Sequence, residues 1–203
     1  MMIVPILCAG ESLRFDGEGP KQLLEVEGEK VLHRICRQVA DRGHLPCVVT
    51  HTLDSPSGLL FRPESNRWTV DTLYSTRPLW GNPYTLVLLG DTYYTDVAMD
   101  TIMAGPQDGG IHVFTDTRDI FALGFRQSEA ETLGGFLRDT LDRWGRDGVE
   151  NYGRMWAFVE KYPSVVRIEI KDITQDFDTM EDYTDFLEGK SKNFLLNPTN
   201  AKV

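Results

Sequence analysis

Ile3-Val4-Pro5-Ile6-Leu7-Cys8-Ala9-Gly10 is the stretch of sequence that decides the fold. Seven apolar residues stand in an unbroken run, and a glycine follows them. Such a run is typical of a strand that is buried on both faces of an α/β sheet. The stretch therefore predicts a first, internal strand whose end at Gly10 opens toward a ligand-binding edge of the sheet.

The chain after this strand has the pattern of a βαβ unit. Helically spaced apolar positions begin after Glu29, Gly43 is a stop signal just beyond them, and residues 46–50 supply a second strand. The apolar positions of the predicted helix are Val31, Leu32, Ile35, Cys36, Val39 and Ala40.

The rest of the chain continues the alternation of strands and helices. Strands are predicted over residues 85–89, 111–114, 121–125 and 165–170, and an amphipathic helix over 133–144 despite Gly134 and Gly135. The Pro-, Ser- and Gly-rich segment 53–68 is predicted to be a long loop. This order indicates an α/β protein with a mostly parallel sheet between helical layers. We predict one domain over residues 1–188 and a polar tail over 189–203.

The charge balance limits the choice of partners. The 203 residues carry a formal net charge of -10, with 41% hydrophobic and 26% charged residues. An acidic surface disfavours nucleic acid, which is bound by clustered Lys and Arg. An anionic ligand must therefore be held by a few local cations or by a bound metal ion. The composition gives no preference for one oligomeric state.

The cysteines and the first residues bear on the location of the protein. Cys8, Cys36 and Cys47 form no CxxC pair and are odd in number, which favours reduced thiols over a disulfide framework. The apolar start lacks a basic leader and is too short to span a membrane. We expect a cytoplasmic protein that does not bind membranes.

A glycine turn with two cations follows the first strand. Gly10 ends the strand, Arg14 comes four residues later, and Lys21 stands in Pro20-Lys21-Gln22-Leu23-Leu24. Glycine allows the backbone to direct successive N–H groups at an anion, and Arg and Lys add positive charge. The pattern favours a triphosphate-binding loop over an ordinary loop with solvated cations. The residues expected to contact the nucleotide here are Ala9, Gly10, Glu11 and Ser12.

With these residues in place, the sequence resembles the nucleotidyltransferases of the GT-A type. Their opening pattern is an apolar strand, Gly-x-Gly-x-Arg, a short variable loop and Pro-Lys-x-Leu. This chain departs from the pattern by carrying Ser12 where the second glycine is usual. The resemblance implies a three-layer α/β/α, Rossmann-like fold with a mostly parallel mixed sheet. The matching residues are Gly10, Arg14, Pro20, Lys21 and Leu23.

Two later segments extend the resemblance to residue 183. Val87-Leu88-Leu89-Gly90-Asp91 is similar to the strand that ends in a magnesium-binding aspartate, and 176–183 is similar to the closing Asp-Thr-x-Glu-Asp-Tyr segment. The resemblance makes Asp91 and Asp178 the metal ligands, with Asp176 as the fallback. Carboxylates are oxygen ligands of the kind that magnesium prefers. The alternative roles are a turn or helix-capping aspartate at Asp91 and, at Asp178, the cap of a helix that starts near Glu181, a role that Thr179 could equally fill.

Four further residues are weaker candidates. Thr69 and Thr72 stand where the family has a turn that reads the base, although a plain helix cap is an equal interpretation. Lys171 and Arg126 follow strands and are candidates for the acceptor phosphate, although exposed strand-end cations are the commoner case. Asp96 and Asp100 are expected to be exposed helix residues.

The resemblance implies transfer of a nucleoside monophosphate from a nucleoside triphosphate to a small phosphorylated acceptor, with a sugar phosphate favoured. Arg14 and Lys21 are the predicted catalytic residues and Mg²⁺ the cofactor. A phosphate monoester is largely dianionic at pH 7, so the attacking oxygen needs no general base. Two alternatives stay open: a GT-A glycosyltransferase, disfavoured because Asp91-Thr92-Tyr93 lacks a second aspartate, and an inactive nucleotide-binding module.

Overall fold

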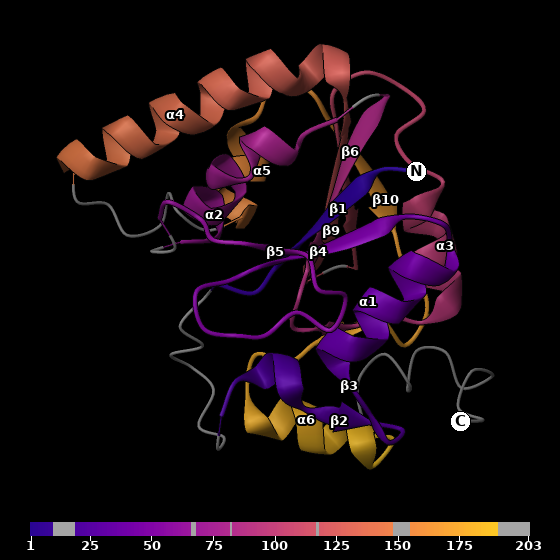
Figure 1. Ribbon diagram of the computed structural model, residues 1–203. Helices are drawn as coiled ribbons and strands as arrows, with labels where there is room; N and C mark the ends of the chain where they lie inside the picture. The colour runs from indigo at the N-terminus through magenta and orange to yellow at the C-terminus, as the bar shows by residue number, and fades with distance from the viewer. Residues whose placement is uncertain (10–18, 66–67, 82, 117, 148–154, 191–203) are drawn as a thin grey trace.

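The structure is a computed structural model that describes residues 1–9, 19–65, 68–81, 83–116, 118–147 and 155–190. Within this part of the chain, strands and helices alternate (Figure 1). The strands are β1 Ile3–Leu7, β2 Glu25–Val26, β3 Glu29–Lys30, β4 Leu45–Val49, β5 Leu60–Phe61, β6 Tyr84–Leu89, β7 Thr92–Tyr93, β8 Ile111–Thr115, β9 Ile120–Arg126, β10 Val165–Glu169 and β11 Gln175–Asp176. The α-helices are α1 Val31–Asp41, α2 Thr69–Ser75, α3 Asp96–Met103, α4 Ala130–Asp147, α5 Met155–Lys161 and α6 Met180–Leu187.

In the described residues, the main sheet has seven strands in the order β10-β8-β9-β6-β1-β4-β5. Six of these strands are parallel to one another, and β9 alone is antiparallel to both of its neighbours. The first strand is internal, between β4 and β6, as the sequence predicts. The carboxyl ends of β1, β4, β6, β8 and β10 therefore lie at one edge, which we call the C-terminal edge.

Helices cover both faces of this sheet. In Figure 1, α2, α4 and α5 lie on one side of the sheet, and α1 and α3 lie on the other. The buried residues form two apolar clusters, one beneath each helical layer. Alternate residues of β6 contribute to both: Leu88 packs with α1 and α3, whereas Val87 packs with α2 and α4. This confirms the three-layer prediction.

The start of α1 and its end follow the expected signals. Gly43 has φ of 77°, a left-handed conformation that glycine adopts without a steric penalty. The N–H groups of Gly43 and His44 donate to the carbonyls of Ala40 and Val39, which stops the helix and turns the chain into β4.

Two expectations need correction. Segment 53–68 is not only a loop, because Leu60 and Phe61 form β5 and pair with Val48 and Val49 at the edge of the sheet. Two residues are too few to show the alternation of a strand, so this strand could not be predicted from the sequence. Helix α4 is longer than predicted and runs through Gly134. No helix in the described ranges has the length and apolar character needed to cross a membrane.

Candidate functional site

Lys21 lies at the centre of a group of three carboxylates at the C-terminal edge. Its Nζ is 2.5 Å from Oδ2 of Asp91, 3.8 Å from Oδ1 of Asp176 and 3.8 Å from Oδ1 of Asp178. The lysine side chain is 10% exposed, and that of Asp178, the most exposed of the three aspartates, is 34% exposed. We call these four residues the Lys21 cluster. Residues that are up to 157 positions apart in the sequence thus meet at one point.

The close approach of β6 to β1 fixes the position of Asp91. The N–H of Gly90 donates to the carbonyl oxygen of Leu7 at 3.0 Å. A Cβ atom on Gly90 would lie 2.2 Å from Sγ of Cys8 and 2.9 Å from that same carbonyl oxygen. Only glycine fits this position, so Gly90 allows the chain to pass the end of β1 and present Asp91.

A small second sheet brings the other two aspartates to Asp91. Strand β7, which begins directly after Asp91, pairs antiparallel with β11, and Thr92 stands opposite Asp176. The N–H of Phe177 donates to the carbonyl oxygen of Asp91 at 3.4 Å. This pairing sets the register of Asp176 and Asp178 against Asp91, which the main sheet alone would not do.

Helix α6 does not use Asp178 as its cap. Thr179 is the N-cap residue: its hydroxyl accepts from the N–H of Asp182, and the carboxylate of Asp182 accepts from the N–H of Thr179. This reciprocal arrangement is a capping box. The alternative role considered for Asp178 therefore falls to Thr179, and the Asp178 carboxylate reaches Lys21 instead.

The electrostatics of the cluster are those of a buried site rich in negative charge. Burial lowers the pKa of Lys21, but attraction to Asp91, Asp176 and Asp178 outweighs it and places the pKa above its ordinary value. The pKa of Asp176 lies well above its ordinary value, mainly because the carboxyl is buried and next because Asp91 repels its charge. Within the described residues, Oδ1 of Asp176 is buried and accepts no hydrogen bond. Buried polar atoms without a hydrogen bond are uncommon in folded proteins, so this oxygen marks the cluster as a candidate functional site.

The donor set fits magnesium in kind. Magnesium takes one or two protein carboxylates and completes its shell with water and substrate phosphates. Asp91 and Asp178 supply such carboxylates, and Asp176 stands beside them. Among the residues described, no group of three or more His, Cys, Asp or Glu side chains is arranged to hold a metal ion.

Comparison with known proteins was made by sequence and by structure. No family model matches the sequence, and no curated protein matches it. Solved structures do match. CTP:phosphocholine cytidylyltransferase (LicC) from Streptococcus pneumoniae aligns with a TM-score of 0.61 and 15% identity over 93% of this chain and 99% of that chain. A Bacillus anthracis protein designated a glucose-1-phosphate thymidylyltransferase aligns with a TM-score of 0.63 and 12% identity over 95% and 96% of the two chains. The chain has a nucleotidyltransferase fold.

A third solved structure with this nucleotidyltransferase fold is HddC from Yersinia pseudotuberculosis, complexed with GMP-PN. It has a TM-score of 0.61 and 14% identity and covers 93% of this chain and 99% of its own. The likeness spans nearly the whole of each chain. The fold thus agrees with the resemblance that the sequence motifs carry.

In this nucleotidyltransferase fold, part of the predicted nucleotide loop lies outside the described residues. Gly10, Glu11, Ser12 and the catalytic candidate Arg14 belong to residues 10–18. Ala9 is described: it is buried and follows the end of β1 at the C-terminal edge. The structure therefore places the start of the loop, and the roles of its other residues stay predictions.

The two threonines differ in their surroundings. Thr69 is the first residue of α2 and is half-buried. Thr72 is buried, and its hydroxyl donates to the carbonyl oxygen of Trp68 at 3.3 Å. Because that hydroxyl is used within its own helix, Thr69 is the better candidate for contact with a base.

The two candidates for the acceptor phosphate lie at different edges. Lys171 follows β10 at the C-terminal edge, is 71% exposed, and forms an ion pair with Glu169 at 3.1 Å. Arg126 is the last residue of β9 and pairs with Tyr84, the first residue of β6. Because β9 is antiparallel, its end lies at the opposite edge from Asp91. This position does not favour the predicted contact of Arg126 with the acceptor, and its guanidinium donates to the carbonyl oxygen of Gln107.

A strained hairpin ties the chain after Lys21 to β7. Strands β2 and β3 are joined by Glu27 and Gly28, which have φ of 54° and 76°. Positive φ at both residues is the geometry of a type I′ turn, and it is unusual for glutamate. The Glu27 carboxylate accepts from Arg34 at 3.0 Å and from the hydroxyl of Tyr93 at 3.2 Å. These contacts hold the turn against β7.

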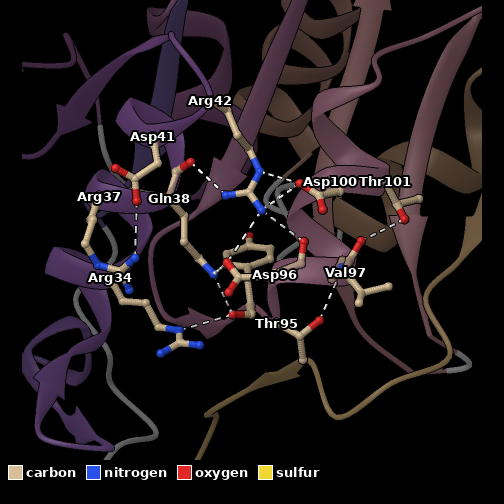
Figure 2. Close-up of polar contacts among 12 residues, drawn as sticks. Arg34, Arg37, Gln38, Asp41, Arg42, Thr95, Asp96, Val97, Asp100 and Thr101 are labelled. Carbon is tan, nitrogen blue, oxygen red and sulfur yellow. Dashed lines mark hydrogen bonds and ion pairs between the residues drawn. The ribbon is translucent and has the colours of Figure 1, made fainter.

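A polar network between α1 and α3 fixes the chain that follows β7 (Figure 2). Gln38 donates to the carbonyl oxygen of Tyr94 at 3.1 Å and to Asp96 at 3.0 Å, and Arg42 donates to Asp100 at 2.7 Å. Asp96 and Asp100 are exposed residues of α3, as predicted. Helix α1 thereby anchors the segment that carries Asp91 into the site.

Asp119 is a residue of this edge that the sequence analysis missed. It lies in the turn between β8 and β9, and its N–H donates to the Asp116 carboxylate at 2.6 Å. Burial, followed by repulsion from Asp116, Asp178 and Asp182, raises the pKa of Asp119 to about 6, while Arg118 opposes the shift. Asp119 thus extends the negative potential of the Lys21 cluster along the edge. A single aspartate in a turn gives no signal of this in the sequence.

This shift predicts how Asp119 affects stability. Because the folded-state pKa exceeds the unfolded value of about 3.9, the folded protein binds the proton more tightly, and stability falls as pH rises from about 4 past 6. Asp119→Asn should therefore raise the free energy of unfolding at pH 7.5 by about 1 kcal/mol, discounted because the carboxyl is only partly buried. The gain should disappear at pH 4.

Chemical denaturation with a chelator present, at both pH values, measures this difference. Asp108→Asn removes the same charge from an exposed position and should change stability little at either pH. An Asp119→Asn gain that is as large at pH 4 as at pH 7.5 would contradict the assignment.

Proposed function

We propose that the protein is a magnesium-dependent nucleotidyltransferase that transfers a nucleoside monophosphate from a nucleoside triphosphate to a small phosphorylated acceptor and releases pyrophosphate. The observation that carries the proposal is the meeting of Lys21 with Asp91 and Asp178 at the C-terminal edge. In open α/β sheets this edge is where ligands bind. The fold, shared with a cytidylyltransferase and a protein designated a thymidylyltransferase, adds support.

The reaction joins two anions, so positioning and positive charge are what the protein must supply. An oxygen of the acceptor phosphate attacks the α-phosphorus, the bond between this phosphorus and the bridging α–β oxygen breaks, and pyrophosphate leaves with that oxygen. Lys21 neutralises charge that grows at the α-phosphate. Arg14, from the predicted loop, contacts the β- and γ-phosphates. When bound by Asp91 and Asp178, magnesium supplies further positive charge to the phosphates.

The other candidate residues have subsidiary roles in this proposal. Ala9, Gly10, Glu11 and Ser12 form the backbone cradle for the nucleotide, and Thr69 contacts the base. Lys171 is placed at the correct edge to approach the acceptor, although it is paired with Glu169. The acceptor class that we favour is a sugar phosphate, and the comparison with a phosphocholine cytidylyltransferase adds phosphocholine to the set to be tested.

Pyrophosphate release tests the proposal. The protein is incubated with Mg²⁺ and each of the four common nucleoside triphosphates, together with a panel of hexose 1-phosphates, polyol phosphates and phosphocholine. We expect release that requires the triphosphate, the acceptor and the metal together. Binding of a triphosphate without turnover on any acceptor would favour a non-catalytic module, and transfer from a nucleotide sugar would favour a glycosyltransferase.

A further inference from the structure

The ammonium of Lys21 fills the space between the two aspartates proposed as metal ligands. It is 2.5 Å from Oδ2 of Asp91 and 3.8 Å from Oδ1 of Asp178, and it also approaches Asp176. The side chain is nine-tenths buried, so it is largely enclosed at this position. A cation held by both Asp91 and Asp178 would therefore compete with this ammonium for the space between them.

A metal ion and this ammonium are not compatible neighbours. Magnesium binds carboxylate oxygens at about 2.0–2.1 Å, and Nζ of Lys21 is 2.5 Å from Oδ2 of Asp91, so a metal ion held by that oxygen would lie close to the ammonium. Two positive charges at such a distance repel strongly, and they do so more in a site with little water than on the surface. The ammonium of Lys21 stands on a flexible four-carbon side chain. The 3-10 turn Lys21–Leu23 fixes the backbone of this residue and not its side chain. The ammonium can therefore move while the main chain stays in place.

We propose that the Lys21 ammonium and the metal ion are alternative occupants of the space between Asp91 and Asp178, so that the metal enters together with the triphosphate, whose phosphates draw Lys21 away from the aspartates. This inference rests on the proposed function, because it assigns the destination of Lys21 to the nucleotide. The inference also sets an order of binding. Before the nucleotide binds, the Lys21 ammonium lowers the affinity of the site for a metal ion.

The arrangement gives Lys21 two roles that are separable by experiment. In one position it compensates three carboxylates that would otherwise repel one another. In the other it serves the α-phosphate. Asp176, whose buried Oδ1 accepts no hydrogen bond in the described residues, remains beside the ligands in both cases and strengthens the attraction for whichever cation is present.

Binding of Mn²⁺ in the absence of nucleotide tests the proposal. The probe is Mn²⁺ alone, followed by electron paramagnetic resonance of the free ion or by calorimetry. The variants are Lys21→Met, which removes the ammonium but keeps the length of the side chain, and Lys190→Met, which removes the same charge from an exposed lysine that follows α6 and pairs with Glu188. We expect Lys21→Met to bind Mn²⁺ at least tenfold more tightly than the wild type, and Lys190→Met to match the wild type.

A second substitution locates the ion. In the Lys21→Met background, Asp91→Asn should remove the gain in Mn²⁺ affinity, because it removes a proposed ligand. If Lys21→Met alone does not fold, as judged by circular dichroism, Lys21→Gln replaces it, since the amide can still donate to Asp91. Equal Mn²⁺ affinity in the wild type and the folded Lys21 variant overturns the proposal, as does a gain that survives Asp91→Asn.

The failure of this inference is distinguishable from the failure of the proposed function. If the wild type releases pyrophosphate but the Lys21 variant gains no Mn²⁺ affinity, the proposed function is supported and the exchange of the ammonium for the metal ion is refuted. If the Lys21 variant gains Mn²⁺ affinity but the protein releases no pyrophosphate with any acceptor, the exchange of cations is supported and the proposed function is refuted.

Discussion

Asp91→Asn is expected to lower the rate of pyrophosphate release by about 10³-fold or more while leaving the protein folded. The substitution keeps the shape of the side chain and removes the charge that attracts both Lys21 and the proposed metal. Lys21 keeps Asp176 and Asp178 as partners at 3.8 Å, so its own burial remains compensated. The measurement is the initial rate of pyrophosphate release at saturating triphosphate and acceptor, together with the far-ultraviolet circular dichroism spectrum.

Asp100→Asn is the matched control for this loss of charge. Asp100 lies on α3, shortly after Asp91 in the sequence, and its side chain is 71% exposed and paired with Arg42 outside the Lys21 cluster. The Asp100→Asn variant should release pyrophosphate at the wild-type rate. An Asp91→Asn variant that turns over at the wild-type rate would refute the assignment of Asp91, even if the protein proves to be a nucleotidyltransferase.

Gly90→Ala is expected to have the largest effect on stability of any alanine substitution in the site. The new Cβ would lie 2.2 Å from Sγ of Cys8, which can move, and 2.9 Å from the backbone oxygen of Leu7, which cannot move without disturbing β1. Overpacking against fixed backbone should cost about 3 kcal/mol. For a domain of this size, such a loss corresponds to a fall in melting temperature of roughly 6–12 °C.

Thermal unfolding of Gly90→Ala beside Gly135→Ala measures the effect. Gly135 lies within α4, and a Cβ there would meet nothing within 4 Å. Alanine at that position should stabilise the helix by about 0.5–1 kcal/mol because it loses less backbone entropy on folding. If Gly90→Ala melts at the wild-type temperature, β6 and β1 are not packed as closely as described.

The internal strands of the fold can be predicted from the sequence, because their apolar runs are long enough to be recognised. The apolar runs at β1 and β6 predict two internal strands, and Asp91, two residues after β6, is an acidic group expected at the ligand edge. Parallel strands end at a shared edge, so the approach of Asp91 to the end of β1 follows from topology once both strands are internal. The helix cap at Thr179 follows from its chemistry with Asp182.

Other features depend on interactions that no local pattern encodes. Strands β7 and β11 have two residues each, too few to show an alternation, yet their pairing sets Asp176 and Asp178 against Asp91. The direction of β9 is likewise absent from its apolar pattern, so the sequence does not show that Arg126 ends its strand at the edge opposite Asp91. Asp119 reaches the site only because the antiparallel β9 returns the chain through a tight turn.

That reversal also determines where the chain has freedom to vary. A parallel neighbour of β8 would require a crossover that leaves the C-terminal edge, whereas the β8–β9 connection stays at this edge. Surface turns tolerate added residues better than strands do. In the proposed nucleotidyltransferase, acceptors of different bulk can therefore be accommodated by lengthening or shortening one hairpin, with the Lys21 cluster and the sheet beneath it unchanged.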